Sequence, residues 1–263
     1  MTSRPGAPGP LKMMCVLAHP DDESLGTGGT LAKYAGEGIE TYLVTATRGE
    51  RGRFGEGGPK PPPEVIGRAR EAELREAARV LGVREVNLLD YGDGCLDQVN
   101  VTEAVSRIAG HIRRVKPHVV VTFGPEGAYG HPDHIAISQL ATAAVVAAPD
   151  CVSKLYYLEW SRQKWDAYQT ALRGLSITVD GLERKVAPWP DWALTTVIDT
   201  RQCWPTVWKA VSCHKTQMSI YKNLEQLSDE HHTAIWGTQE FYRVFSLVNG
   251  GRTRESDLFD GLR

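Results

Sequence analysis

The chain alternates short apolar runs with amphipathic segments through its first 160 residues. Residues 13–18 and 118–123 are almost continuous apolar runs, which is typical of strands that are buried on both faces of a sheet. Further strands are expected at 41–46, 84–89 and 154–160. Helices are expected at 26–34, 64–81, 105–112 and 133–148. This alternation predicts an α/β fold that is Rossmann-like, with a mostly parallel sheet and helices on both faces.

The pattern becomes less regular after about residue 160, where we expect strands at 176–179 and 195–198 and a helix at 201–217. The chain length suits one large domain. Within it we predict three parts. They are a flexible tail at 1–11, a Rossmann-like catalytic core at 12–160, and an α+β C-terminal elaboration at 161–263 that completes the substrate pocket.

All seven tryptophans lie at or after residue 160. Aromatic faces can stack on sugar rings, but large aromatic side chains more often pack in a core or an interface. We therefore assign none of them individually to the substrate. The adjacent His231 and His232 are expected to be exposed to solvent.

Polar clusters follow the two apolar runs. Residues 19–23 read His-Pro-Asp-Asp-Glu, and residues 131–134 read His-Pro-Asp-His. Ligands bind beyond the carboxyl ends of the strands in an open α/β sheet, so we expect the two clusters to converge. His19 and Asp22 are close enough on one turn to ligate one ion, and residues three apart on a helix, such as His131 and His134, share a face. Two or three imidazoles with a carboxylate suit zinc with an open position.

Such a cluster can also do no more than cap a helix. Aspartate is a favoured cap, and Pro132 suits the first position of a helix. Two clusters at strand ends, both with spare carboxylates, favour the metal site over two unrelated caps.

The two clusters resemble the signature of the LmbE-like, or PIG-L, family of zinc-dependent de-N-acetylases, in residues 18–23 and 130–134. Weaker likenesses lie at 47–50, 70–74, 93–94, 214–217 and 240–242, so the resemblance spans most of residues 12–262. It implies a metal-dependent hydrolase that removes an acetyl group from the amide nitrogen of an N-acetylglucosamine-type sugar or conjugate. The attacking group would be a zinc-bound water.

The resemblance also implies individual roles. His19, Asp22 and His134 would be the metal ligands, for Zn²⁺ or for another divalent ion such as Fe²⁺. Asp21 would act as general base and then carry the proton to the leaving amine. His131 would stabilise or protonate the tetrahedral intermediate.

Two neighbours of His131 complete the expected machinery. Asp133 would orient an imidazole from outside the ligand set. Tyr129 would donate its hydroxyl to the oxyanion, although a tyrosine in a loop can equally serve only to pack.

Three further residues are assigned to substrate binding. Arg70 shares the apolar stripe of the expected helix 64–81, where it either pairs with Glu73 or points into the pocket to hold substrate hydroxyls. The resemblance favours the second reading. It also implies substrate binding by Asp93 and places His214 at the pocket rim, although His214 can equally be a capping or core histidine.

Residues 48–63 form a long expected loop that is rich in glycine and ends in three prolines. Long loops in compact domains are often functional. This loop is therefore either a mobile lid over the site or a solvated connection.

The composition is that of an ordinary globular enzyme, with 41% hydrophobic and 24% charged residues. The net charge of −2 gives no reason to expect a nucleic-acid partner. No stretch approaches the roughly 18 apolar residues of a membrane span. The start of the chain lacks the apolar stretch of a signal peptide, and five scattered cysteines indicate reduced thiols. We therefore expect a cytoplasmic enzyme that binds a small-molecule N-acetylated sugar, and a homo-oligomer stays open.

Three alternatives stay open. One is an amidase on another sugar-linked amide, of the mycothiol-conjugate type. A second is a non-haem iron oxygenase, which also uses two histidines and a carboxylate but would leave Asp21 and His131 without a role. The third is a non-catalytic sugar-binding α/β module, which would be expected to have lost Asp21 or a ligand. No Gly-x-Gly-x-x-Gly follows the first apolar run, which argues against a dinucleotide site.

Overall fold

A seven-stranded sheet forms the centre of the computed structural model, which describes residues 9–263 except 56, 173–175, 180 and 252. Most of the expected tail at 1–11 lies outside the described residues. The strand order is β3-β2-β1-β4-β5-β9-β8, with the first five strands parallel and the last two antiparallel to their neighbours. These strands are β1 Lys12–Leu17, β2 Glu40–Thr47, β3 Glu85–Tyr91, β4 Val119–Phe123, β5 Lys154–Glu159, β8 Thr196–Asp199 and β9 Thr238–Ser246.

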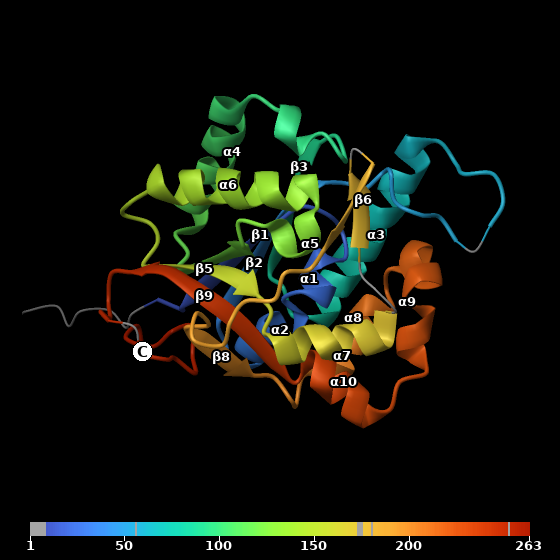
Figure 1. The fold of residues 1–263 in the computed structure, drawn as a ribbon. Coiled ribbons are helices and arrows are strands. Elements are labelled where there is room, and N and C mark those ends of the chain that lie inside the picture. The colour runs from blue at the N-terminus through green and yellow to red at the C-terminus, as the bar shows by residue number, and fades with distance from the viewer. Residues whose placement is uncertain (1–8, 56, 173–175, 180, 252) are drawn as a thin grey trace, which may run out of the picture.

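Helices cover both faces of this sheet, with α4 and α6 on one face and α2 and α8 on the other (Figure 1). The first half of the chain contributes α1 Asp22–Leu25, α2 Gly28–Gly36, α3 Pro63–Val80, η1 Leu96–Gln98, α4 Val101–Val115, α5 Gly127–Gly130 and α6 Pro132–Val146. The second half contributes α7 Arg162–Leu172, α8 Trp204–Val211, η2 Lys215–Gln217, α9 Met218–Glu225 and α10 Asp229–Trp236. A separate hairpin pairs β6 Ser176–Val179 with β7 Leu182–Lys185. The predicted fold class is confirmed.

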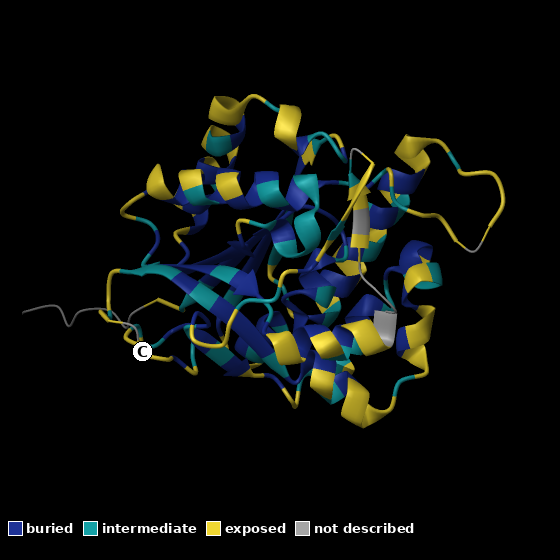
Figure 2. Cartoon of the chain, in the orientation of Figure 1, coloured by how far each residue is buried: buried dark blue, intermediate teal, exposed yellow. Residues whose placement is uncertain are grey.

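The strands β1 and β4 are neighbours at the centre of the sheet, and nearly all of their residues are buried (Figure 2). The chain runs outward from β1 in opposite directions, to β2 and β3 on one side and through β4 to β5 on the other. This reversal opens a crevice beyond the carboxyl ends of β1 and β4. Both polar clusters begin there, because residue 19 follows β1 and residue 131 follows β4 after one short helix.

Local sequence signals explain several of the element boundaries. Pro63 begins α3. Gly82 follows the end of that helix with a φ of 76°, in the left-handed region that favours glycine. Asn100 caps α4 by accepting a hydrogen bond from the backbone of Glu103 at 3.0 Å. These caps leave the helix boundaries close to those that the sequence predicts.

Two expectations for the C-terminal part are wrong. The helix expected at 201–217 ends at Val211, because the chain turns there and directs His214 and the following polar residues toward the site. His232 is buried, donates a hydrogen bond from Nε2 to the Leu224 carbonyl, and stacks on Trp204 with ring centroids 4.9 Å apart. It is therefore a core residue and not a solvated one.

The strand β9 was not anticipated from the sequence, although it lies between β5 and β8. Its buried positions include Gln239, Glu240 and Arg243, which break the apolar alternation that would indicate a strand. Arg243 pairs with Glu255, whose carboxylate also binds Lys154 at 2.8 Å. This buried carboxylate thus ties β5 and β9 to the C-terminal segment.

Replacing Glu255 by glutamine should lower the free energy of unfolding by about 3–5 kcal/mol, since the change leaves Lys154 buried without its counter-charge. Burial alone would raise the pKa of Glu255, but its hydrogen bonds, foremost that from Lys154, lower the pKa to about 2. The ionised carboxylate therefore stabilises the fold above its ordinary pKa of 4.5, and this contribution is lost as the pH falls toward 2.

Urea unfolding at pH 7 and pH 4 measures both effects. The matched control is Glu76→Gln, which removes an exposed ion pair with Arg79 and should change stability by less than about 1 kcal/mol. Equal losses for the two variants would contradict a structural role of the buried carboxylate.

Candidate metal centre and active site

Three predicted ligands meet beyond the carboxyl end of β1. The Nδ1 atom of His19 lies 3.2 Å from Nε2 of His134. Asp22 faces both rings, with Oδ1 at 3.4 Å from Nε2 of His134 and Oδ2 at 3.8 Å from Nδ1 of His19. Ligand atoms held about 2.0–2.2 Å from a tetrahedral zinc lie about 3.3–3.6 Å from one another. The three side chains therefore fit one small divalent ion without rearrangement.

The charges around His19 also fit a cation. Burial would lower the pKa of this imidazole, but Asp133 and Asp93, each bonded to its Nε2, together raise the pKa to about 10. The surrounding carboxylates thus favour positive charge at this position. Burial of His134, with the charge of His19 as a smaller cause, lowers the pKa of His134 well below its ordinary value. A neutral imidazole is the form that binds a metal.

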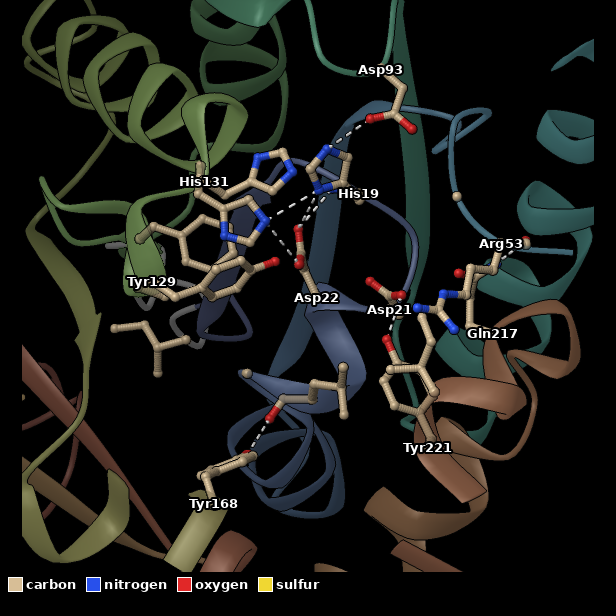
Figure 3. Close-up of a pocket in the computed structure, with 18 of the residues that line it drawn as sticks. His19, Asp21, Asp22, Arg53, Asp93, Tyr129, His131, Tyr168, Gln217 and Tyr221 are labelled. Atoms are coloured by element: carbon tan, nitrogen blue, oxygen red, sulfur yellow. Dashed lines mark hydrogen bonds and ion pairs between the residues drawn. The ribbon is translucent and has the colours of Figure 1, made fainter. Parts of the chain in front are cut away.

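Asp133 holds His19 in place from behind. Its Oδ2 lies 3.1 Å from Nε2 of His19 and accepts the backbone N–H of Gly94 at 2.6 Å, while its Oδ1 accepts that of Leu96 at 3.1 Å. A carboxylate on one ring nitrogen leaves the other nitrogen free for a metal. The histidine that Asp133 orients is therefore His19, and Figure 3 shows Asp93 bonded to the same ring.

A second set of three residues, His19, His131 and Asp133, also lies within metal-binding distance. We favour the first set, because both oxygens of Asp133 are already occupied by backbone donors. His131 instead caps α6, with its Nδ1 accepting the backbone N–H of Asp133 at 3.2 Å. His131 therefore caps α6 and also lies beside the predicted metal ligands, so the two interpretations of this cluster do not exclude each other.

His131 does not have the protonated state that an acid role would need. Burial and the charge of His19 lower the pKa of His131 to about 4, and the weaker attraction of Asp133 does not reverse this. The ring stacks on His134 with centroids 4.8 Å apart. A neutral His131 fits the predicted role of stabilising the tetrahedral intermediate better than that of protonating it, because protonation would need an imidazolium.

Asp21 faces away from the ligand set although it precedes Asp22 directly. Its backbone has a φ of 109°, in the left-handed region that favours glycine. Its Oδ2 accepts hydrogen bonds from Arg70 at 3.0 Å and from the Tyr221 hydroxyl at 2.8 Å. Strain of this kind at a functional site costs about 1–3 kcal/mol and persists only where neighbours enforce the conformation.

Arg70 does not pair with Glu73, which was the local alternative. Its guanidinium bonds the carbonyl oxygens of Gly49 and Pro20 as well as Asp21, and it lines the pocket. Glu73 instead accepts hydrogen bonds from the backbone and hydroxyl of Thr216. Arg70 thus points toward the site, where its hydrogen bonds are to other protein groups. Binding of substrate hydroxyls by Arg70 stays a prediction.

His214 lies behind the site and not at the pocket rim where we expected it. Its side chain is fully buried, and its Nε2 lies 2.8 Å from Glu23. Glu23 in turn accepts the backbone N–H of Asp21 at 2.9 Å. Burial would lower the pKa of His214, but the charge of Glu23 outweighs it and raises the pKa. The pair therefore supports the backbone turn at Asp21.

A pocket of about 620 Å³ opens over these residues, within the range of about 300–1,000 Å³ that is usual for ligand sites. Tyr129 lies in its wall, with its ring 5.3 Å from that of His134 and its hydroxyl pointing toward Asp22 in Figure 3. Burial raises the pKa of Tyr129 well above its ordinary value, which keeps the hydroxyl protonated and able to donate. Asp93 also lines the pocket.

The C-terminal part completes the pocket wall, together with the start of the loop 48–63. The side chain of Gln217 donates to the Arg53 carbonyl at 2.7 Å, and the Gly55 backbone donates to the Thr216 carbonyl at 3.1 Å. These bonds hold Arg53 beside Tyr221 and Gln217 (Figure 3). The first part of the loop is thus docked on the C-terminal part, and a lid function stays a prediction.

Sequence reasoning missed Tyr221 and Gln217 as pocket residues. Neither has a local signal, because each meets its partner only after a separation of more than 160 residues. Trp160 is the one tryptophan among the described pocket residues. Trp192 is 81% exposed, whereas Trp236 is buried in a second cluster with Trp165.

Comparison with known proteins agrees with this geometry. Residues 14–145 match the family described as PIG-L, GlcNAc-PI de-N-acetylase. A 1D-myo-inositol 2-acetamido-2-deoxy-alpha-D-glucopyranoside deacetylase from Kineococcus radiotolerans is 32% identical over 96% of this chain and 83% of its own length. The chain belongs to the PIG-L family. It is an enzyme that hydrolyses an amide as a deacetylase.

Solved structures share the fold of this PIG-L protein. An N,N'-diacetylchitobiose deacetylase from Pyrococcus horikoshii has a TM-score of 0.65 at 20% identity, covering 89% of this chain and 83% of its own. A 4-carboxy-2-hydroxymuconate hydratase from Pseudomonas putida has a TM-score of 0.67 at 20% identity, covering 92% and 99%. At this identity the likeness shows the fold alone. Among the described residues no helix is long and apolar enough to cross a membrane.

The two candidate ligand sets can be separated by metal content. Asp22→Ala should weaken zinc binding by more than about 100-fold, because it removes a predicted ligand. His131→Ala should keep zinc, because that residue belongs only to the second set. Zinc is measured by atomic emission after equilibrium dialysis against a fixed free concentration. Loss of zinc in His131→Ala with retention in Asp22→Ala would assign the metal to the second set.

Proposed function

We propose that this PIG-L protein removes the acetyl group from the amide nitrogen of an N-acetylglucosamine conjugate in a zinc-dependent hydrolysis. The observation that carries the proposal is the pairing of one suitable ligand set with a separate carboxylate, Asp21, in the same pocket. The relative from Kineococcus radiotolerans is named as a deacetylase of 1D-myo-inositol 2-acetamido-2-deoxy-alpha-D-glucopyranoside, an N-acetylglucosaminyl-inositol, and we extend that substrate class to this chain.

His19, Asp22 and His134 would hold the ion. Zinc, when bound, supplies a Lewis acid that polarises the amide carbonyl and lowers the pKa of a water molecule beside it. Fe²⁺ would suit the same nitrogen and oxygen donors.

Asp21 is the group proposed to move protons. It accepts one proton as the attacking water adds to the amide carbon, and it passes that proton to the nitrogen as the C–N bond breaks. Arg70 and Tyr221 hold the carboxylate in one orientation. Without that restraint the side chain could turn toward the cation that Asp22 binds.

Tyr129 and His131 are proposed to stabilise the oxygen of the tetrahedral intermediate. Both rings line the pocket next to His134, and the protonated Tyr129 hydroxyl can donate a hydrogen bond there. Donors that are already in position stabilise developing negative charge without reorganisation.

The sugar is proposed to bind on the side of Asp21. Arg53 and Gln217 lie on this side of the pocket beside Tyr221 (Figure 3), and Arg51 lines the same pocket. Such groups can satisfy the hydroxyls of a sugar, whose burial without partners would be costly. The proposed partner is thus a small N-acetylated sugar conjugate, and the amidase alternative differs only in the acyl group.

Asp21→Asn is the test of this function. The variant should keep zinc and the pocket shape but lose about 10²–10⁴-fold in kcat, because an amide cannot accept the proton of water. Acetate release from N-acetylglucosaminyl-inositol by the zinc-loaded protein measures activity, and emission spectroscopy measures zinc. An Asp21→Asn protein with wild-type turnover would remove the general base from the mechanism.

Tyr221→Phe examines how Asp21 is held. It removes one hydrogen bond to the carboxylate and should lower kcat about tenfold or more, with KM for the sugar conjugate nearly unchanged. Tyr168→Phe is the matched control, since its hydroxyl donates to the Leu25 carbonyl instead of to a catalytic group. A rise in KM with constant kcat would show that Tyr221 binds substrate and does not position the base.

A further inference from the structure

The segment 124–130, which connects β4 to α6, carries chemistry that the proposed mechanism needs. It places Tyr129 in the pocket wall and leads directly into His131. It also packs tightly on a proposed metal ligand, because a side chain at Gly127 would lie 2.9 Å from Cβ of His134. A shift of this segment would therefore move the hydroxyl that is proposed to meet the tetrahedral intermediate.

The backbone of this segment is strained and needs anchors outside itself. Ala128 has a φ of 64°, in the left-handed region that favours glycine. A conformation of this kind persists only where the surroundings enforce it. One anchor lies at the end of the segment, where Arg184 of β7 donates a hydrogen bond to the Gly130 carbonyl at 3.3 Å. The hairpin β6–β7 passes beside α5 in Figure 1.

The second anchor is the side chain of Glu126. Its Oε1 accepts a hydrogen bond from Nε1 of Trp189 at 3.2 Å, and the backbone of Trp189 is itself bonded to the Trp160 carbonyl. Its Oε2 faces Glu159, the last residue of β5. Gly124 permits this approach, because a side-chain carbon there would collide with Oε1 of Glu159 and lie only 2.8 Å from Oε2 of Glu126.

Two carboxyl groups thus face each other where solvent does not reach. Glu159 is 2% exposed, and its Oε1 has no hydrogen-bond donor among the described residues. Glu240 of β9, the partner of Glu159 in the sheet register, is a third carboxylate and gives both oxygens to Ser161. Burial, and next the contact with Glu126, raises the pKa of Glu159 to about 11. Carboxylates so close together cannot both ionise at low cost, and a proton on one of them removes the repulsion.

We propose that Glu159 and Glu126 share one proton, and that this pair positions the segment 124–130 for the hydrolysis. The protonated Glu159 donates to Oε2 of Glu126, while Trp189 donates to Oε1 of the same carboxylate. Both glutamates are positioning residues, which act through Tyr129 and not by touching the substrate. The inference rests on the proposed function, in which Tyr129 stabilises the intermediate.

The strength of such a pair suits this task. A hydrogen bond from a neutral acid to a carboxylate is charge-assisted, which makes it about twice as strong as a bond between neutral groups. Burial strengthens it further, because the surroundings screen it less than water does. A hydroxyl stabilises developing charge only when it is already in position, and a misplacement of about 1 Å can cost about 100-fold in rate.

Infrared difference spectroscopy tests the proton. The spectrum of the wild-type protein minus that of Glu159→Gln at pH 7 should contain the C=O stretch of a protonated carboxyl group. Glu240→Gln is the matched control and should leave that band in place, because the oxygens of Glu240 already accept hydrogen bonds from Ser161. Absence of the band from the wild-type protein would overturn the shared proton. Calcium that is bound by the wild-type protein and lost in Glu159→Gln, measured by emission spectroscopy, would also overturn it, since a cation would then join the two carboxylates.

A pair of substitutions at Glu159 tests the positioning. Glu159→Gln keeps a neutral donor toward Glu126 and should keep kcat for N-acetylglucosaminyl-inositol within about twofold. Glu159→Leu removes the donor and should lower kcat about tenfold or more, with KM nearly unchanged. A merely structural role would lower the melting temperature and leave kcat of the folded enzyme as it was. That result for Glu159→Leu would overturn the positioning role.

A double-mutant cycle tests the route through Tyr129. Glu159→Leu should lower kcat by a smaller factor in a Tyr129→Phe background than in the wild-type protein, because the hydroxyl that it misplaces is already gone. Equal factors in the two backgrounds would overturn action through Tyr129. If Glu159→Leu does not fold, Trp189→Phe takes its place in the cycle, since it removes the other donor to Glu126.

Failure of this inference and failure of the proposed function give different results. A wild-type protein that releases acetate from N-acetylglucosaminyl-inositol but lacks the infrared band keeps the function and overturns the pair. Absence of acetate release by the wild-type protein would overturn the proposed function, and the positioning role of Glu159 with it. The infrared band would still decide whether the two glutamates share a proton.

Discussion

The active site depends on how one turn of backbone separates two adjacent carboxylates. Asp22 faces His19 and His134, whereas Asp21 faces Arg70 and Tyr221. Neighbouring side chains can diverge in this way because Asp21 adopts a φ of 109°, a conformation that an aspartate does not favour. The surrounding contacts enforce it, so Asp22 lies with the two histidines of the proposed ligand set and Asp21 lies apart from them. Metal binding and proton transfer would otherwise compete for the same group.

The fold was predictable because its signals are local. Buried strands such as β1 and β4 are continuous apolar runs, and the Rossmann-like order places their carboxyl ends together. That is why two short clusters sufficed to anticipate the meeting of His19 with His134. The strand β9 was not predicted, because its buried Glu240 and Arg243 interrupt the apolar alternation that indicates a strand. From the sequence alone, a polar residue that is buried beside a distant partner cannot be told from a surface residue.

The supporting residues of the site were the hardest to foresee. Tyr221 meets Asp21 across 200 residues, and His214 reaches Glu23 across 191. The family resemblance placed His214 at the rim, and the residues alone left a capping or core role open, since a histidine near the end of an expected helix carries no sign of its partner. The C-terminal part therefore supports the turn 21–23 from behind. The hydratase that shares this fold shows why the fold by itself does not decide the reaction.

The capping role of His131 has a consequence for which of its tautomers forms. Its Nδ1 accepts the backbone N–H of Asp133, so that nitrogen carries the lone pair and a neutral ring must keep its hydrogen on Nε2. The first turn of α6 thus selects one tautomer and leaves Nε2–H as the donor that remains. An imidazole in this form can donate a hydrogen bond to an anionic oxygen while staying uncharged, which a histidine free to rotate would do only part of the time.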